Sequence, residues 1–190
     1  MNRRILFLTL SALFCCTAVF AQSVRFIRVE TSEPYTPVYQ DEEGLDSVLV
    51  KGIAQTATGD KKWFRIAAEY STGSEWLDRL TIEYYVLFPG GTNVFKGTVN
   101  YVDIPRGREH LSEMYLHFNS YARHYKRGTI EYAAVALIDG RQAAVETNKH
   151  KPENWWKEMP VHPRGLLDRN MTPFVIFNME KSEAQDHGAR

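Results

Sequence analysis

Alternation of apolar and polar residues is clearest over residues 80–88, in the middle of the chain. Five apolar or aromatic residues recur there at every second position and so share one face of an extended strand: Leu80, Ile82, Tyr84, Val86 and Phe88. The opposite face is only partly polar, because Tyr85 and Leu87 also need cover. A strand that is covered on one face and partly on the other belongs in the middle of a packed sheet.

Similar patterns predict further strands at residues 23–30, 46–55, 63–70, 95–104, 111–119, 129–138 and 141–147. The apolar face changes between Phe26 and Ile27, which indicates a bulge or an edge strand. Residues 89–93 (Pro-Gly-Gly-Thr-Asn) predict a hairpin turn, and Asp139-Gly140 predicts a type I′ turn, which requires a positive φ at both central residues. Two polar, proline-containing stretches, residues 31–44 and 148–164, are predicted loops.

The segment at residues 108–127 fits two patterns. A strand would use Met114, Leu116 and Phe118, whereas a helical stripe would use Leu111, Tyr115, Phe118, Ala122 and Tyr125. Because its neighbours are strands, we expect a strand over 111–119 and a short turn or helical loop over 120–127.

Seven to nine short strands without a long helical pattern predict an all-β protein. We expect an immunoglobulin-like antiparallel β-sandwich over residues 22–179, with an irregular C-terminal segment. A lipocalin-type barrel fits less well, because the predicted connections at 31–44 and 148–164 are long. Residues 180–190 are polar and are predicted to form a disordered tail.

The first 21 residues have the features of a secretory signal peptide. Arg3 and Arg4 precede an apolar stretch, and cleavage is expected between Ala21 and Gln22. The mature protein would then be periplasmic, associated with the outer membrane, or extracellular. Both cysteines, Cys15 and Cys16, lie in the leader, so the mature domain must be held by its core without disulfides.

The charge balance argues against polyanionic partners. Removing the leader takes away Arg3 and Arg4 and leaves 21 basic against 23 acidic residues. A nearly neutral chain gives no electrostatic argument for nucleic acid, and no Lys/Arg run suggests an anionic membrane surface.

Catalytic and metal-binding motifs are absent from the sequence. The six histidines show neither a His-Glu-x-x-His nor a His-x-His spacing, and His110, His117 and His124 are expected to be scattered over a strand and a loop. Glu69, Asp78 and Glu83 lie on or near central strands, but solvated strand faces and loop ends are the preferred explanation for them, because some pair among 23 acidic residues will always look suitable. We therefore expect no enzyme, no metal and no cofactor.

Aromatic residues are the best indication of a binding role. Trp155 and Trp156 are adjacent in the proline-containing loop at 148–164. Exposed indoles could stack on sugar rings or anchor a protein partner. The alternative is that one or both fold back to close the open end of the sandwich, because large apolar side chains are usually buried.

The C-terminal part of the chain resembles a known family. Trp155-Trp156, Gly165-Leu166-Leu167, Arg169 and Thr172-Pro173-Phe174 resemble the C-terminal pattern of small exported proteins of Verrucomicrobia, and Trp76-Leu77-Asp78 and the Asp139-Gly140 hairpin are similar too. These are immunoglobulin-like β-sandwich proteins associated with a type IV pilus gene cluster in Akkermansia-type bacteria. The resemblance implies a structural or adhesion role at the surface or in the periplasm, and it brings no catalytic residues.

The sequence thus predicts an exported, non-enzymatic structural, adhesion or assembly protein with a protein partner in the cell envelope. The alternative is a carbohydrate-binding module that uses Trp155 and Trp156 to bind a glycan.

Overall fold

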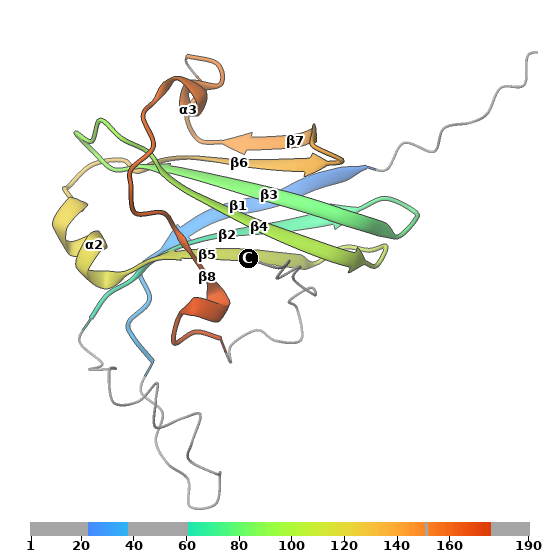
Figure 1. Cartoon of the computed structure of the whole chain (residues 1–190), viewed down its shortest axis with the longest axis horizontal. Helices are drawn as coiled ribbons and strands as arrows, with labels where there is room; N and C mark the ends of the chain where they lie inside the picture. Colours follow the sequence, from blue (N-terminus) through green and yellow to red (C-terminus); the bar gives the residue numbers. More distant parts are fainter. Residues whose placement is uncertain (1–22, 38–60, 151, 176–190) are drawn as a thin grey trace, which may run out of the picture.

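The computed structural model describes residues 23–37, 61–150 and 152–175. Two four-stranded sheets stack face to face (Figure 1), with strand orders β1-β2-β5-β8 and β4-β3-β6-β7. Every strand pair within the sheets is antiparallel. The strands are β1 (Val24–Ser32), β2 (Phe64–Thr72), β3 (Leu77–Leu87), β4 (Phe95–Ile104), β5 (His110–Leu116), β6 (Glu131–Ile138), β7 (Arg141–Thr147) and β8 (Leu167–Asp168). The predicted all-β sandwich is confirmed.

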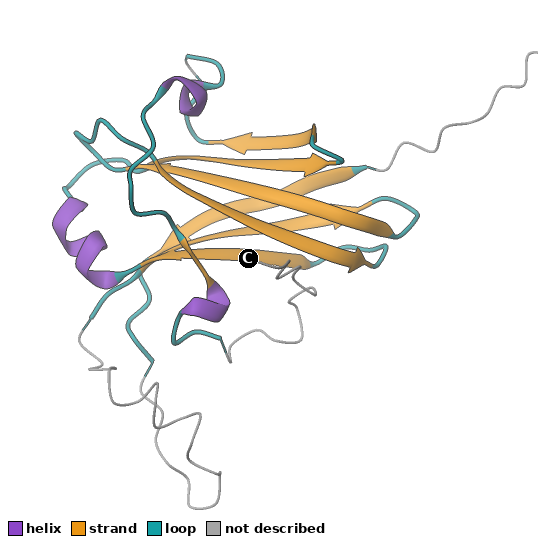
Figure 2. Cartoon of the chain, viewed as in Figure 1, coloured by secondary structure: helices purple, strands orange, loops and turns teal. Residues whose placement is uncertain are grey.

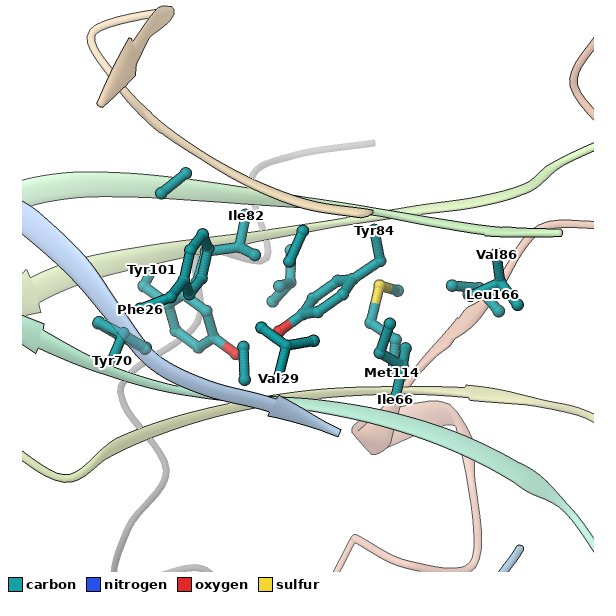
Figure 3. Close-up of a cluster of buried hydrophobic side chains, with 14 of the residues drawn as sticks. Phe26, Val29, Ile66, Tyr70, Ile82, Tyr84, Val86, Tyr101, Met114 and Leu166 are labelled. Atoms are coloured by element: carbon teal, nitrogen blue, oxygen red, sulfur yellow. The ribbon is translucent and has the colours of Figure 1, made fainter. Parts of the chain in front are cut away.

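The central position predicted for residues 80–88 is confirmed as well. Strand β3 pairs with β4 on one side and β6 on the other. Leu80, Ile82, Tyr84 and Val86 point into the core, where each is at most 1% exposed. Figure 3 shows Tyr84 pointing towards Val29 of the opposite sheet, with Met114 beside it, and Val86 lying next to Leu166.

Local turn chemistry also follows the sequence. Asp139 and Gly140 have φ values of 50° and 72°, as the type I′ turn between β6 and β7 requires. The register of β1 against β2 shifts between Phe26 and Arg28, and β1 is the edge strand of its sheet. The change of apolar face between Phe26 and Ile27 therefore marked both a bulge and an edge.

Among the described residues, three short helical elements lie outside the sheets (Figure 2): α2 (Phe118–His124), α3 (Trp155–Glu158) and the 3₁₀ turn η1 (Arg169–Met171). The strand predicted at 111–119 is too long at its C-terminal end. It ends at Leu116, because His117 caps α2 by accepting a hydrogen bond from the Asn119 backbone N–H at 3.3 Å. The helical alternative was correct from Phe118 onward. The predicted loop at 148–164 contains α3.

A closing segment, residues 160–168, joins the edges of the two sheets. The Val94 N–H donates to the Pro160 carbonyl at 2.9 Å, and the His162 N–H donates to the Val94 carbonyl at 2.8 Å. The Leu166 N–H then donates to the Lys96 carbonyl at 2.9 Å, and β8 pairs with β5. Leu166 itself lies in the core between the sheets (Figure 3). The closing segment therefore covers the start of the β4 edge of one sheet before it adds a strand to the other.

Several predictions fall on residues that the structure does not describe. These are the leader with its expected cleavage between Ala21 and Gln22, the strand at 46–55, and the tail at 180–190. Within the described ranges, no helix is long and apolar enough to cross a lipid bilayer.

Candidate functional site

Trp155 and Trp156 are both buried, and their exposed fractions are 2% and 3%. Helix α3 places both indoles on the outer face of the β4-β3-β6-β7 sheet. There they pack in one cluster with Tyr85, Leu87, Val94, Ala133 and Val135. Tyr85 and Leu87 are the residues of the central strand whose outward side chains needed cover, so α3 supplies that cover.

The expected location of these indoles was partly wrong. They fold back, as the alternative required, but they cover the outside of a sheet rather than an open end of the sandwich. The Trp155 Nε1–H donates to Thr147 Oγ1 at 3.3 Å, and Lys149 Nζ lies 5.2 Å from the Trp155 ring centroid. With their faces covered, neither ring is available to stack on a sugar unless α3 moves away from the sheet. A binding role for Trp155 and Trp156 stays a prediction that this geometry does not favour.

Exposed aromatic side chains gather instead at the end of the sandwich where α2 lies. Tyr35 and Tyr125 are 55% and 42% exposed. Together with Phe118 and Tyr121 they line a hollow of about 530 Å³, which we call the aromatic hollow. Its polar lining consists of Glu33, Lys61, Lys62 and Asn119.

Backbone pairing fixes one wall of the aromatic hollow. The Thr36 N–H donates to the Lys61 carbonyl and the Trp63 N–H donates to the Pro34 carbonyl, both at 2.8 Å. This short ladder holds Tyr35 opposite α2, because Tyr35 forms a bridge with Lys62. The Trp63 indole anchors the ladder by donating to Thr36 Oγ1 at 3.0 Å.

Charged groups accompany the rings of the hollow. Lys61 Nζ lies 4.3 Å from the Phe118 ring centroid, and Lys62 Nζ lies 5.2 Å from that of Tyr35. The Tyr121 hydroxyl is buried without a hydrogen-bond partner in the described part of the chain. Burial, and then the nearby Glu33 carboxylate, raise the pKa of Tyr121, so its hydroxyl stays protonated. Exposed rings beside an amide, a carboxylate and two ammonium groups can hold a sugar ring or an extended peptide.

The candidate carboxylates do not form an acid–base pair. Glu69 lies on the outer face of the β1-β2-β5-β8 sheet, where it binds Arg28 at 2.7 Å. Glu83 lies on the outer face of the other sheet, within 2.8 Å of Lys96 Nζ and 2.6 Å of the Tyr85 hydroxyl. Those two hydrogen bonds outweigh the effect of burial and lower the pKa of Glu83. Asp78 is exposed at the start of β3, so the three carboxylates are far from a shared cleft.

The predicted scattering of the first three histidines is confirmed. His110 of β5 stacks on Tyr70 of β2, His117 caps α2, and His124 ends that helix. No group of three or more metal-binding side chains occurs within the described residues. His124 and His162 do meet, with ring centroids 4.9 Å apart, although sequence spacing does not relate them.

Comparison with known proteins places the chain in a family. A protein-family model matches residues 21–187, and the chain belongs to that family. A crystal structure of a protein from Akkermansia muciniphila is similar, with a TM-score of 0.69 and 15% sequence identity over 88% of this chain and 95% of that one. At this identity the similarity establishes the shared fold. No curated protein matches the sequence.

Proposed function

We propose that the chain is an exported, non-enzymatic structural or adhesion protein of the cell envelope, which works by assembly with a protein partner. The observation that carries this proposal is the family membership over residues 21–187. The match begins where the leader is expected to end, which supports a mature domain that starts near Gln22. A link to a type IV pilus system is the finer part of the proposal. It is supported by the tail motifs and by the similarity to the Akkermansia muciniphila protein.

Strand order supports the immunoglobulin-like description. Immunoglobulin-type sandwiches place strands A-B-E in one sheet and C′-C-F-G in the other. Here β1-β2-β5 and β4-β3-β6-β7 follow the same order along the chain, and β8 lies beside β5 in the position of strand D.

The edge formed by β7 is the surface we assign to assembly. The closing segment covers only the start of the β4 edge of the same sheet, at Val94 and Lys96, whereas β7 pairs only with β6 among the strands described, although it also lies next to β1 of the other sheet. Arg141, Gln142 and Ala143 are exposed along it. An unpaired strand edge offers backbone donors and acceptors to a strand from a partner, which is a frequent mode of protein recognition.

Site-specific photo-crosslinking in cells tests this assignment. A photoreactive residue is placed at Ala143 on the β7 edge and, in a matched control, at exposed Asp78 on β3. We expect Ala143 to capture one defined envelope protein, identified by mass spectrometry, and Asp78 to capture none. Capture of the same protein at both positions, or of nothing at Ala143, would count against the β7 edge. If neither Ala143 nor a general cross-linker links the chain to an envelope component, the assembly role itself fails.

Glycan binding remains the second candidate, and the aromatic hollow favours it. We propose that Tyr35 and Tyr125, rather than the buried tryptophans, would stack on the sugar. The double variant Tyr35→Ala/Tyr125→Ala should lose at least tenfold in affinity on a glycan array, whereas Trp76→Ala, which removes an exposed ring outside the hollow, should not. Absence of glycan binding by the unmodified protein rejects this candidate.

A further inference from the structure

A second hollow lies at the same end of the sandwich as α2, and the proposed function does not use it. It encloses about 230 Å³ between the β3–β4 turn, the end of α2 and the closing segment. Its side-chain lining includes Arg123, His124, Lys126 and His162, and no Asp or Glu lines it. We call it the basic hollow.

The two cations of the basic hollow are free to bind a ligand. Within the described ranges, neither Arg123 nor Lys126 forms an ion pair or a side-chain hydrogen bond. The Lys126 ammonium lies beside the glycine turn, since a Cβ added to Gly90 would be 3.8 Å from its Nζ. Gly90 has a positive φ of 71°, which favours glycine, so no side chain from this position fills the space next to the Lys126 ammonium.

Phe95 holds the two imidazoles in place. This residue is 2% exposed in β4. The His162 ring stacks on it at 4.3 Å, with 28° between the planes, and the His124 ring meets it edge-on at 5.1 Å. A rigid aromatic support fixes both rings before any ligand arrives, which lowers the entropy that binding costs.

Of the two ring nitrogens of His162, only Nδ1 has a hydrogen-bond partner among the described residues. His162 Nδ1 lies 3.1 Å from both the backbone N–H and the carbonyl oxygen of Arg164, so it is engaged in either tautomer. Nε2 has no partner among the described residues and remains available as a donor when Nδ1 accepts or when the ring is charged.

These observations point to an anion site. We propose that the basic hollow binds a tetrahedral oxyanion, sulfate or phosphate, either free or as an ester, through Arg123, Lys126 and the two imidazoles. Four nitrogen-bearing side chains from two segments, with no carboxylate among them, match the charge and the donor requirement of such a group. Burial, and then His162, Arg123 and Arg164, lower the pKa of His124, and a bound oxyanion would reverse that effect.

Titration of the histidine rings by NMR tests the proposal on the full purified chain. We expect sodium sulfate, compared with sodium chloride at equal ionic strength, to raise the pKa of His124 by about one unit and to shift the ring resonances of His162. His150 is exposed and does not line the hollow, so its ring resonances should respond equally to the two salts. Equal responses in sulfate and chloride would overturn the proposal.

Paired variants test whether the sulfate effect requires the side chains of the basic hollow or only the overall charge of the protein. Arg123→Gln/Lys126→Gln should abolish the sulfate-dependent shift, whereas Arg127→Gln, which removes an exposed neighbouring charge outside the hollow, should retain it. If the double variant keeps the shift, or if Arg127→Gln also loses it, the site is not the basic hollow. Comparing inorganic phosphate with glucose 6-phosphate identifies the source. A half-saturating concentration at least tenfold lower for the ester indicates a phosphorylated ligand, and equal values indicate a free ion.

Discussion

Gly97 of β4 lies against Met114 in the core and Leu166 of the closing segment. A Cβ at this position would collide with Met114 Sδ and would stand 2.7 Å from Leu166 Cβ. Since Leu166 Cβ is fixed by its backbone, we expect Gly97→Ala to lower the free energy of unfolding by about 1–3 kcal/mol. Thr98→Ala, on the exposed side of the same strand, should change it by less than about 0.5 kcal/mol. Urea denaturation measures both, and equal losses would contradict the close approach.

Two core tyrosines differ in what their hydroxyl groups do. Tyr101 donates to Ser112 Oγ at 2.9 Å in a buried hydrogen bond. The buried Tyr84 hydroxyl has no hydrogen-bond partner in the described part of the chain, and burial raises its pKa. We therefore expect Tyr101→Phe to destabilise the fold by about 1 kcal/mol and Tyr84→Phe to be neutral or stabilising. Thermal unfolding of the two variants decides, and a larger loss for Tyr84→Phe would show that its hydroxyl is satisfied.

At the scale of single residues, the sequence predicts orientation better than contact. Alternation correctly placed Ile82 and Tyr84 inside, because a strand turns successive side chains to opposite faces. It could not pair Gly97 with Leu166, or His124 with His162, because their proximity depends on the path of the closing segment. Nor could the sequence decide whether Trp155 and Trp156 are buried, because their burial depends on how α3 packs on the sheet.

Among the elements, α3 has a stability role that can be measured. Trp155 and Trp156 cover the outward side chains of β3 and β6. We expect Trp155→Ala and Trp156→Ala each to cost about 3–5 kcal/mol, because each leaves a large cavity. Trp76 is 59% exposed and provides a matched control, with an expected loss below about 0.5 kcal/mol for Trp76→Ala. Intact stability of the Trp155 and Trp156 variants would mean that α3 does not cover the sheet in solution.

Local sequence patterns predicted the strands, but they did not predict the hollows at the end of the sandwich. Period-two patterns with β-branched and aromatic residues identified β2, β3, β4, β6 and β7 from local sequence alone. The aromatic hollow requires Tyr35, which follows β1, to face α2. Its aromatic residues lie on separate segments, and Phe118 fitted both a strand and a helix. Only the tertiary fold brings these segments together, so attention to adjacent aromatic residues led to Trp155 and Trp156 instead.

For the molecule as a whole, acid should weaken the fold as the pH falls through about 6.5. Burial, more than the neighbouring cations, lowers the pKa of His117 and His124 from the ordinary value of 6.5. The unfolded chain then binds protons more readily than the folded one below about pH 6.5, so the free energy of unfolding falls as pH falls. The double variant His117→Asn/His124→Gln should show a shallower decline, whereas exposed His150→Gln should not. An unchanged slope in the double variant would assign the pH effect to other groups.

Closure of the sandwich depends on a segment that comes late in the chain. Residues 160–168 hydrogen-bond to Val94 and Lys96, insert Leu166 into the core and add β8 to β5. Phe174 then stacks on Tyr115 with centroids 4.7 Å apart. A chain ending at residue 159 would leave one sheet edge and part of the core exposed, so we expect it to lose cooperative thermal unfolding.

A chain ending at residue 179 lacks only the predicted tail and should unfold within about 0.5 kcal/mol of the full chain. Because the larger deletion could fail for several reasons, Leu166→Ala isolates the core contact, with an expected cost of about 2–5 kcal/mol. Circular dichroism on the three proteins makes the comparison. If the chain ending at 159 unfolds as cooperatively as the full chain, the two sheets hold together without the closing segment.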